Sequence, residues 1–205
     1  PVDPGKKREL LMHILSERYQ EQILVFVKTK HLCNRIAEQI TKDGIPALAI
    51  HGNKSQGQRL KALSDFKAGK VRVLCATDVA ARGLDIPLLP LVINFDMPMV
   101  AEDYVHRIGR TGRAGANGDA VSLVATDEGG LLRAVNRLLK QDIVLESKPG
   151  FEPTTTMRMD LTPKGIKVSQ IAPGLADTEF STVRFHGDRR KADAVYAGMT
   201  ALRPE

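Results

Sequence analysis

The stretch "VRVLCATDVAARGLDIP", residues 71–87, joins a short apolar run to a loop of small and special residues. Residues 71–76 are nearly all apolar and rich in valine, which is typical of a parallel strand buried on both faces. The loop holds Thr77 and Asp78, which favour a helix start, and Gly83, which permits unusual backbone angles. This order indicates an α/β fold with a site at the carboxyl ends of its strands.

The same alternation runs through the chain outside residues 71–87. Short apolar runs predict strands, and amphipathic patterns between them predict helices. The predicted strands are 23–28, 45–50, 71–76, 91–95 and 120–125, and the predicted helices are 5–18, 30–43, 56–68, 101–113 and 128–140. This order predicts a parallel sheet with helices on both faces. The segment 147–156, "SKPGFEPTTT", has the turn and linker residues of a domain end.

The composition sets wide bounds on function. The chain has 205 residues, 42% of them hydrophobic, which is enough for one core with an appendage, and its formal charge of +6 permits a polyanionic partner without requiring one. Cys33 and Cys75 lie too far apart for a zinc motif and are predicted to be core thiols. No apolar run is long enough to span a membrane and no signal peptide opens the chain, so we expect a cytoplasmic protein without a membrane partner.

Two more loops follow predicted strands and therefore belong to the same edge of the sheet. In "KTKH", 28–31, Thr29 can cap the next helix, and in "HGNKSQGQR", 51–59, Gly52 allows another backbone to approach. Gln56 and Arg59 stand one helical turn apart in the second loop. Each feature alone fits an ordinary helix start, but three such loops at one edge favour a phosphate-rich ligand.

The stretch "YVHRIGRTGRAGANG", residues 104–118, concentrates His106, Arg107, Arg110 and Arg113. In a continuous helix, residues 106, 110 and 113 share one face, where like charges repel. A bound anion would offset that repulsion, and arginine suits phosphate because its planar fork makes paired hydrogen bonds. We therefore predict a short amphipathic helix that presents arginines to a ligand.

The phosphate cradle that would complete a nucleotide site is absent from the sequence. There is no G-x-x-x-x-G-K-[ST] loop and no acidic cluster that suggests a metal site. The chain offers arginines to a nucleotide without the loop that holds one, so it is interpreted as half of a site.

The segments "VFVKT", "HGNKSQGQR", "ATDVAARGLDIP" and "HRIGRTGRAG" resemble, in order and spacing, the C-terminal RecA-like domain of DEAD-box RNA helicases, most closely bacterial members. The resemblance covers about residues 1–153. It implies that ATP with Mg²⁺ lies in a cleft shared with an N-terminal RecA-like lobe, which this chain lacks. Alone, the chain is expected to hold no cofactor and to show no ATPase activity.

The same resemblance assigns roles to single residues. Arg110 and Arg113 match positions that reach the γ-phosphate, and Arg113 is the expected arginine finger. Gly83 and Asp85 match the nucleotide cleft, with Asp85 at the ribose, and His106 matches a position that couples the two lobes. The positions that match contacts to the RNA sugar–phosphate backbone are Thr29, Gly52, Arg59, Thr77 and Asp78. Such contacts carry no base information, so binding is expected to be independent of sequence.

Residues 157–205 resemble instead the late part of a short-chain dehydrogenase/reductase, with a strand "IKVSQI" at 166–171 and a loop around Pro173 and Gly174. In that family this turn and Thr178 lie beside the nicotinamide. No glycine-rich phosphate loop precedes the segment and no Y-x-x-x-K pair exists, so hydride transfer is disfavoured. We interpret 1–153 as a helicase domain and 154–205 as a Rossmann-type α/β fragment, joined in a natural or engineered hybrid or by misassembly of the sequence. The strand 166–171 can pair with an open sheet edge in this molecule or in another.

Three classes of function stay open. The first is the lobe of an ATP-dependent RNA helicase, the second is a non-catalytic RNA-binding or scaffold hybrid, and the third is a fragment of an NAD(P)-dependent oxidoreductase. Salt-dependent binding of single-stranded RNA separates the first two from the third. ATPase activity restored by an added N-terminal lobe separates the first from the second.

Overall fold

The computed structural model describes residues 1–82, 84, 86, 89–112 and 118–154. Gly83, Asp85, Arg113 and the whole segment 155–205 lie outside these residues, and so do the expectations that fall on them. The resemblance of residues 157–205 to a dehydrogenase therefore stays a prediction from sequence.

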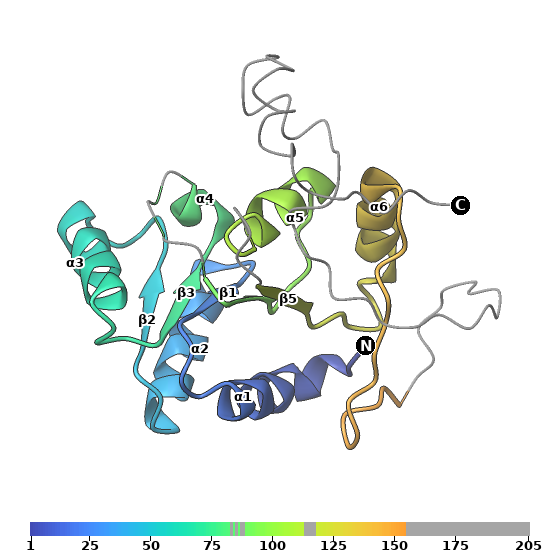
Figure 1. Cartoon of the computed structure of the whole chain (residues 1–205), viewed down its shortest axis with the longest axis horizontal. Coiled ribbons are helices and arrows are strands. Elements are labelled where there is room, and N and C mark those ends of the chain that lie inside the picture. The colour runs from blue at the N-terminus through green and yellow to red at the C-terminus, as the bar shows by residue number, and fades with distance from the viewer. Residues whose placement is uncertain (83, 85, 87–88, 113–117, 155–205) are drawn as a thin grey trace, which may run out of the picture.

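A five-stranded parallel sheet forms the centre of the fold, in the order β2-β3-β1-β4-β5 (Figure 1). The strands are β1 Ile23–Phe26, β2 Ala47–Ile50, β3 Val73–Ala76, β4 Leu91–Asn94 and β5 Asp119–Ser122. β1 to β4 lie inside the predicted strands 23–28, 45–50, 71–76 and 91–95, and β5 begins one residue before the predicted strand 120–125. Phe26 is in register with Ala76 and Asn94, and Ser122 pairs with Asn94, so the carboxyl ends of the strands form one edge.

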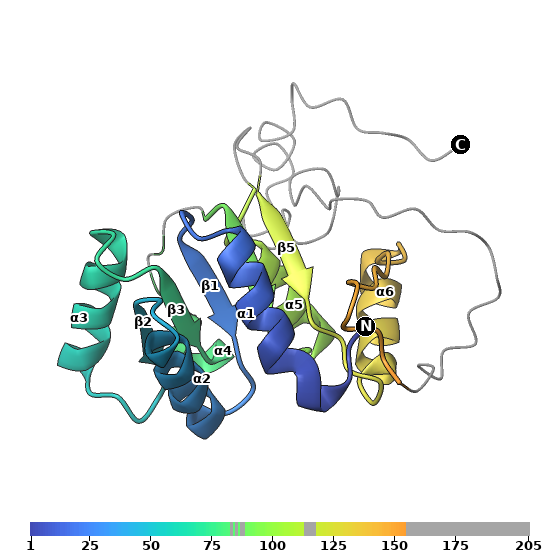
Figure 2. The ribbon, with the colours of Figure 1, turned by 90° about the horizontal axis from the view of Figure 1, so that it is seen from below.

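Helices cover both faces of the sheet, as the alternation predicted (Figure 2). They are the 3₁₀ helix η1 Pro4–Lys6 and the α-helices α1 Lys7–Glu17, α2 Lys30–Lys42, α3 Gln56–Lys67, α4 Asp78–Ala81, α5 Ala101–Ile108 and α6 Gly129–Leu139. One core joins α1 and α2 to Val25 and Cys75, while a second joins α3 and α4 to Leu24 and Leu74. Successive strand residues point to opposite faces, so a nearly continuous apolar run buries both sides.

The predicted helix 101–113 is shorter than expected, because α5 ends at Ile108. Gly109 closes it by donating its N–H to the carbonyl of Val105 at 2.9 Å, and Thr111 then makes a parallel bridge with Leu89. Arg110 therefore lies beyond the helix. The prediction that residues 106, 110 and 113 share one helical face was wrong for His106 and Arg110, and residue 113 lies outside the described residues.

Gly118 stands where the chain enters β5, and its missing side chain is required there. A Cβ at this position would overlap the Oγ1 of Thr111 and lie 2.8 Å from the backbone nitrogen of Gly112. The Thr111 hydroxyl itself donates to the carbonyl of Leu89. The glycine thus lets β5 pass directly beside the turn that carries Arg110.

Within the residues that the structure describes, no helix is long and apolar enough to cross a membrane. Both cysteines are buried free thiols, as predicted. Burial raises the pKa of the Cys33 thiol to about 12.

Candidate functional site

The predicted loops meet at the carboxyl edge of the sheet. Thr29 follows β1, Gly52 follows β2 and Thr77 follows β3, while Arg59 comes from α3 beside them. Thr29 and Gly52 are exposed, and Thr77 and Arg59 are half-buried. The structure therefore brings together the residues that the sequence placed at one site.

Thr29 is the N-cap of α2, as predicted, and its Oγ1 accepts the N–H of Leu32 at 3.2 Å. Its neighbours connect this loop to others: the N–H of Lys28 donates to Asp96 Oδ2 at 2.8 Å, and Lys30 Nζ donates to Asn53 Oδ1 at 3.3 Å. Hydrogen bonds thus join the loop after β1 to the loops after β2 and β4.

The side chain of His51 holds the loop that contains the exposed Gly52. Its buried ring accepts the N–H of Asn53 on Nδ1 at 3.3 Å, and its Nε2 lies 2.9 Å from Asn34 Oδ1. Burial, followed by the charges of the neighbouring lysines, lowers the pKa of His51, so a neutral ring suits both contacts. A Cβ on Gly52 would meet no atom of the described chain, which leaves that backbone open to an outside ligand.

Arg59 connects α3 to α4. Its guanidinium donates to Gln56 Oε1 and to the carbonyl of Ala80, each at 3.4 Å, which confirms that Gln56 and Arg59 face each other across one helical turn. A capping box between Ser55 and Gln58 fixes the start of α3. Thr77 occupies the N-cap position of α4, as predicted, but its side chain makes no capping bond to that helix among the described contacts.

Asp78 and Arg107 form a two-pronged ion pair between α4 and α5. Arg107 Nε and Nη2 donate to the two carboxylate oxygens at 2.6 and 2.8 Å. The same guanidinium donates from Nη1 to Asn94 Oδ1 and to the carbonyl of Asp96, and it lies 5.1 Å from the centre of the Phe26 ring. Its side chain is only 2% exposed.

Arg107 was not part of the predicted ligand face of residues 106, 110 and 113, and the structure buries its guanidinium. Its charge is paired with Asp78, an acid that lies 29 residues earlier in the sequence and is brought close to it by the fold. Asp78 was expected to contact RNA, and the structure shows that its carboxylate also has an internal partner in Arg107. A direct RNA contact from Asp78 stays a prediction.

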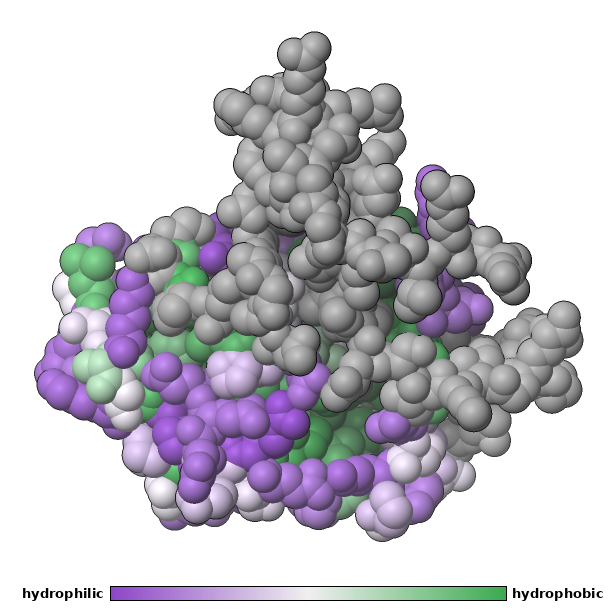
Figure 3. Space-filling view, viewed as in Figure 1, coloured by the Kyte–Doolittle hydropathy of each residue, from purple (hydrophilic) through white to green (hydrophobic). Residues whose placement is uncertain are grey.

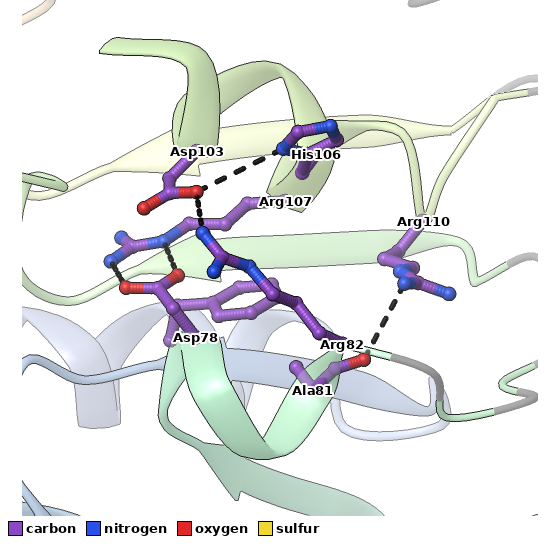
Figure 4. Close-up of a pocket in the computed structure, with 8 residues that line it drawn as sticks. Asp78, Ala81, Arg82, Asp103, His106, Arg107 and Arg110 are labelled. Atoms are coloured by element: carbon purple, nitrogen blue, oxygen red, sulfur yellow. Dashed lines mark hydrogen bonds and ion pairs between the residues drawn. The ribbon is translucent and has the colours of Figure 1, made fainter. Parts of the chain in front are cut away.

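A small pocket opens between α4 and α5 beside this ion pair (Figure 4). Asp103 accepts a hydrogen bond from Arg82 and lies 3.8 Å from His106 Nδ1. Arg110 donates to the carbonyl of Leu84 at 3.1 Å and to that of Ala81 at 3.4 Å. Figure 4 shows Arg82, His106 and Arg110 gathered around one opening, although Arg110 lies beyond the helix.

The side chains around this pocket suit an anion. The side chains of Arg82 and His106 are 62% and 54% exposed, and guanidinium groups bind phosphate oxygens through paired donors. Among the described residues, no group of three His, Cys, Asp or Glu side chains could hold a metal ion. Gly83, Asp85 and Arg113, assigned to the nucleotide, lie outside the described residues.

Sequence reasoning missed the two acids that organise the arginines. Asp103 lies one residue before the stretch 104–118, and Asp78 was assigned elsewhere. A pairing across α4 and α5 has no local sequence signal, because it depends on β3 and β4 both flanking β1. The acidic residue on the first turn of α5 was nevertheless visible in the sequence.

Comparisons with known proteins agree with this geometry. The helicase conserved C-terminal domain family matches residues 6–115. The ATP-dependent RNA helicase DBP2 of Candida glabrata is 42% identical over 165 residues, 78% of this chain and 29% of that protein. The ATP-dependent RNA helicase RhlB of Pseudomonas syringae is 43% identical over 148 residues, 72% of this chain and 37% of that protein.

Solved structures give the same result. The chain of the E. coli DEAD-box protein SrmB, bound to the regulator of ribonuclease activity A, superposes with a TM-score of 0.72 at 38% identity, covering 78% of this chain and 94% of that one. Dbp5 of S. cerevisiae, bound to RNA and ADP BeF3, superposes with a TM-score of 0.61 at 31% identity, covering 66% of this chain and 37% of that one. The matched part of this chain spans about a third or less of the two curated relatives.

Proposed function

The chain belongs to the DEAD-box RNA helicases as their helicase C-terminal domain, and we propose that it completes an ATP site and an RNA-binding surface together with an N-terminal RecA-like lobe. The arrangement at the carboxyl edge carries this proposal. The loops after β1, β2 and β3 follow the carboxyl ends of their strands, and the pocket of Arg82, His106 and Arg110 lies between α4 and α5. We assign the loops to a phosphate backbone and the pocket to a nucleotide.

In the nucleotide half, Arg110 and Arg113 stabilise the charge on the phosphoryl group that bound ATP supplies. The carbonyls of Ala81 and Leu84 hold the guanidinium of Arg110 in place. Gly83 and Asp85 are proposed to line the cleft, with Asp85 at the ribose, and His106 to couple the two lobes. Mg²⁺ is proposed to bind to the other lobe, since the described residues offer no metal cluster.

In the RNA half, Thr29, Gly52, Arg59, Thr77 and Asp78 are proposed to contact the sugar–phosphate backbone. Exposed backbone at Gly52 and the cap at Thr29 present N–H groups to phosphates without reading bases. Binding is therefore proposed to be independent of sequence, and the chain alone is proposed to have no appreciable ATPase activity.

Three finer points are proposals from sequence alone. The closest kinship is proposed to be with bacterial members, although the similar relatives come from fungi, plants and bacteria. Residues 154–205 are proposed to be a dehydrogenase-like addition, which makes the chain a hybrid. A cytoplasmic location is proposed because the spacing of Cys33 and Cys75 in the sequence indicates no disulfide framework.

The RNA half is tested by titrating a fluorescent single-stranded RNA with the pure chain at several salt concentrations. Replacing Arg59 with Ala should weaken binding about 3- to 10-fold and reduce the salt slope by about 0.7, the value for one phosphate contact on a single strand. Arg35→Ala, which removes an exposed arginine from α2, is the matched control. Equal losses in both variants would mean that Arg59 contributes only net charge.

A further inference from the structure

The loop after β4 carries a carboxylate that holds the loop after β1. Asp96 follows the last residue of β4 by two positions, and its side chain is only 16% exposed. Its Oδ2 accepts the backbone N–H of Lys28 at 2.8 Å, from a residue 68 positions earlier in the sequence. Lys28 comes directly before Thr29, the N-cap of α2. This hydrogen bond therefore fixes the start of a loop that is proposed to contact RNA.

A buried ion pair fixes the residues on both sides of Asp96. Figure 3 shows hydrophilic side chains on the surface over α1 and α2, whereas Lys7, the first residue of α1, is buried. Its Nζ donates to Glu128 Oε2 at 2.6 Å and to the carbonyl of Phe95 at 2.9 Å. The same Nζ lies 3.7 Å from Asp96 Oδ1. Glu128 Oε1 in turn accepts the N–H of Met97 at 3.0 Å.

This ion pair is placed to hold the loop rather than to bind a ligand. The side chains of Lys7 and Glu128 are only 6% and 14% exposed. Taking two charges out of water is costly, so we interpret the pair as fixing one arrangement of the loop after β4. Arg107 adds a further contact, because its Nη1 donates to the main-chain carbonyl of Asp96 at 2.7 Å. The backbone of Asp96 is thus held on several sides while its carboxylate accepts the N–H of Lys28.

We propose that Asp96 is a positioning residue for RNA binding, whose carboxylate holds the backbone of Lys28 so that Thr29 and the first turn of α2 meet the RNA phosphates. This inference rests on the proposed function, which assigns Thr29 to the RNA backbone. Asp96 carries the wrong charge to bind phosphate itself. Electrostatics alone therefore predicts that removing this acid tightens RNA binding, whereas positioning predicts that removing the hydrogen-bond acceptor weakens it.

Two variants separate these effects, because both remove the negative charge. Asp96→Asn keeps an oxygen that can accept the N–H of Lys28, and Asp96→Ala keeps none. In titrations of a fluorescent single-stranded RNA with the full chain, Asp96→Ala should bind about 3- to 10-fold more weakly than Asp96→Asn. Asp96→Asn should bind at least as tightly as the wild type. Glu38→Ala, which removes an exposed acid from α2, is the charge control and should not weaken binding.

Amide hydrogen exchange followed by NMR, without RNA, measures the hold on the loop directly. Exchange at Lys28 should be about 10-fold faster in Asp96→Ala than in Asp96→Asn. The amide of Val27, which donates to the carbonyl of Ala76 at 3.0 Å, should stay protected in both variants and so report that the sheet is intact.

Equal dissociation constants for Asp96→Ala and Asp96→Asn, or equal exchange at Lys28, would overturn the proposal. A wild type that fails to bind RNA in a salt-dependent manner would instead refute the proposed function. The exchange rates at Lys28 would then decide by themselves whether Asp96 holds this loop.

Discussion

The buried guanidinium of Arg107 gives the sharpest test of how the site is held together. Arg107→Met keeps much of the side-chain volume and removes the charge. It leaves the carboxylate of Asp78 without its two donors, and the carbonyl oxygens of Asn94 and Asp96 each without one. The change therefore removes one partner of a buried ion pair and leaves the other charge uncompensated, which lowers the free energy of unfolding more than removing both partners would.

The expected loss follows from the geometry. Removing one partner of a buried ion pair costs about 3–5 kcal/mol, and the Asp78 side chain is 26% exposed, so the lower end applies. We expect the free energy of unfolding to fall by about 3 kcal/mol, a large share of the roughly 5–15 kcal/mol that a domain has. With an ordinary urea dependence, the unfolding midpoint should fall by about 1.5 M.

Urea unfolding followed by circular dichroism measures this loss, with Arg35→Met as the control for an exposed arginine. Asp78→Asn should also destabilise, and the double variant should lose less than the sum of the two single losses, because both remove the same pair. A loss below about 1 kcal/mol for Arg107→Met, or strict additivity with Asp78→Asn, would refute the reasoning.

Three further predictions concern packing, pH and thiol chemistry. Gly118→Ala should lower the melting temperature by several degrees, because the added Cβ would overlap the hydroxyl of Thr111. Gly57→Ala, in open space on α3, is the control and should be neutral or stabilising. Equal melting temperatures for the two variants would contradict the packing at β5. Since the pKa of His51 is lowered in the folded state, its contribution to stability is complete above the unfolded value of about 6.5 and is lost as the pH falls below it. As the pH is lowered across this range, the urea midpoint should therefore fall less for His51→Gln than for the wild type. Parallel plots of midpoint against pH for the two proteins would count against the buried neutral ring. Because burial raises the pKa values of Cys33 and Cys75, a thiol reagent near neutral pH should label neither in the native protein and both in urea, and rapid native labelling would show that these thiols are accessible.

The sheet was predictable because its signal is local. Runs such as 23–28 and 71–76 are apolar at nearly every position, as a strand covered by helices on both faces must be. Turn or cap residues follow each run. The cap at Thr29 and the pairing of Gln56 with Arg59 were also visible, since both depend on spacing within one helical turn.

The roles of the arginines were not predictable in the same way. Nothing near Arg107 in the sequence distinguishes it from Arg110, yet one is buried against Asp78 and the other donates to the carbonyls of Ala81 and Leu84. The difference arises because β3 and β4 lie on either side of β1, which brings α4 against α5. Gly109, which ends α5 early, and Gly112 were local signs that the helical face would not continue.

The steady-state ATPase rate of this chain, mixed with a purified N-terminal lobe of a DEAD-box helicase and single-stranded RNA, tests the central claim most directly. The account predicts no appreciable turnover by either part alone and RNA-stimulated turnover in the mixture, abolished by Arg113→Ala or Arg110→Ala and retained by Arg137→Ala on α6. Robust turnover by this chain alone, or restored turnover that survives loss of both Arg110 and Arg113, would contradict a half-site completed by these arginines.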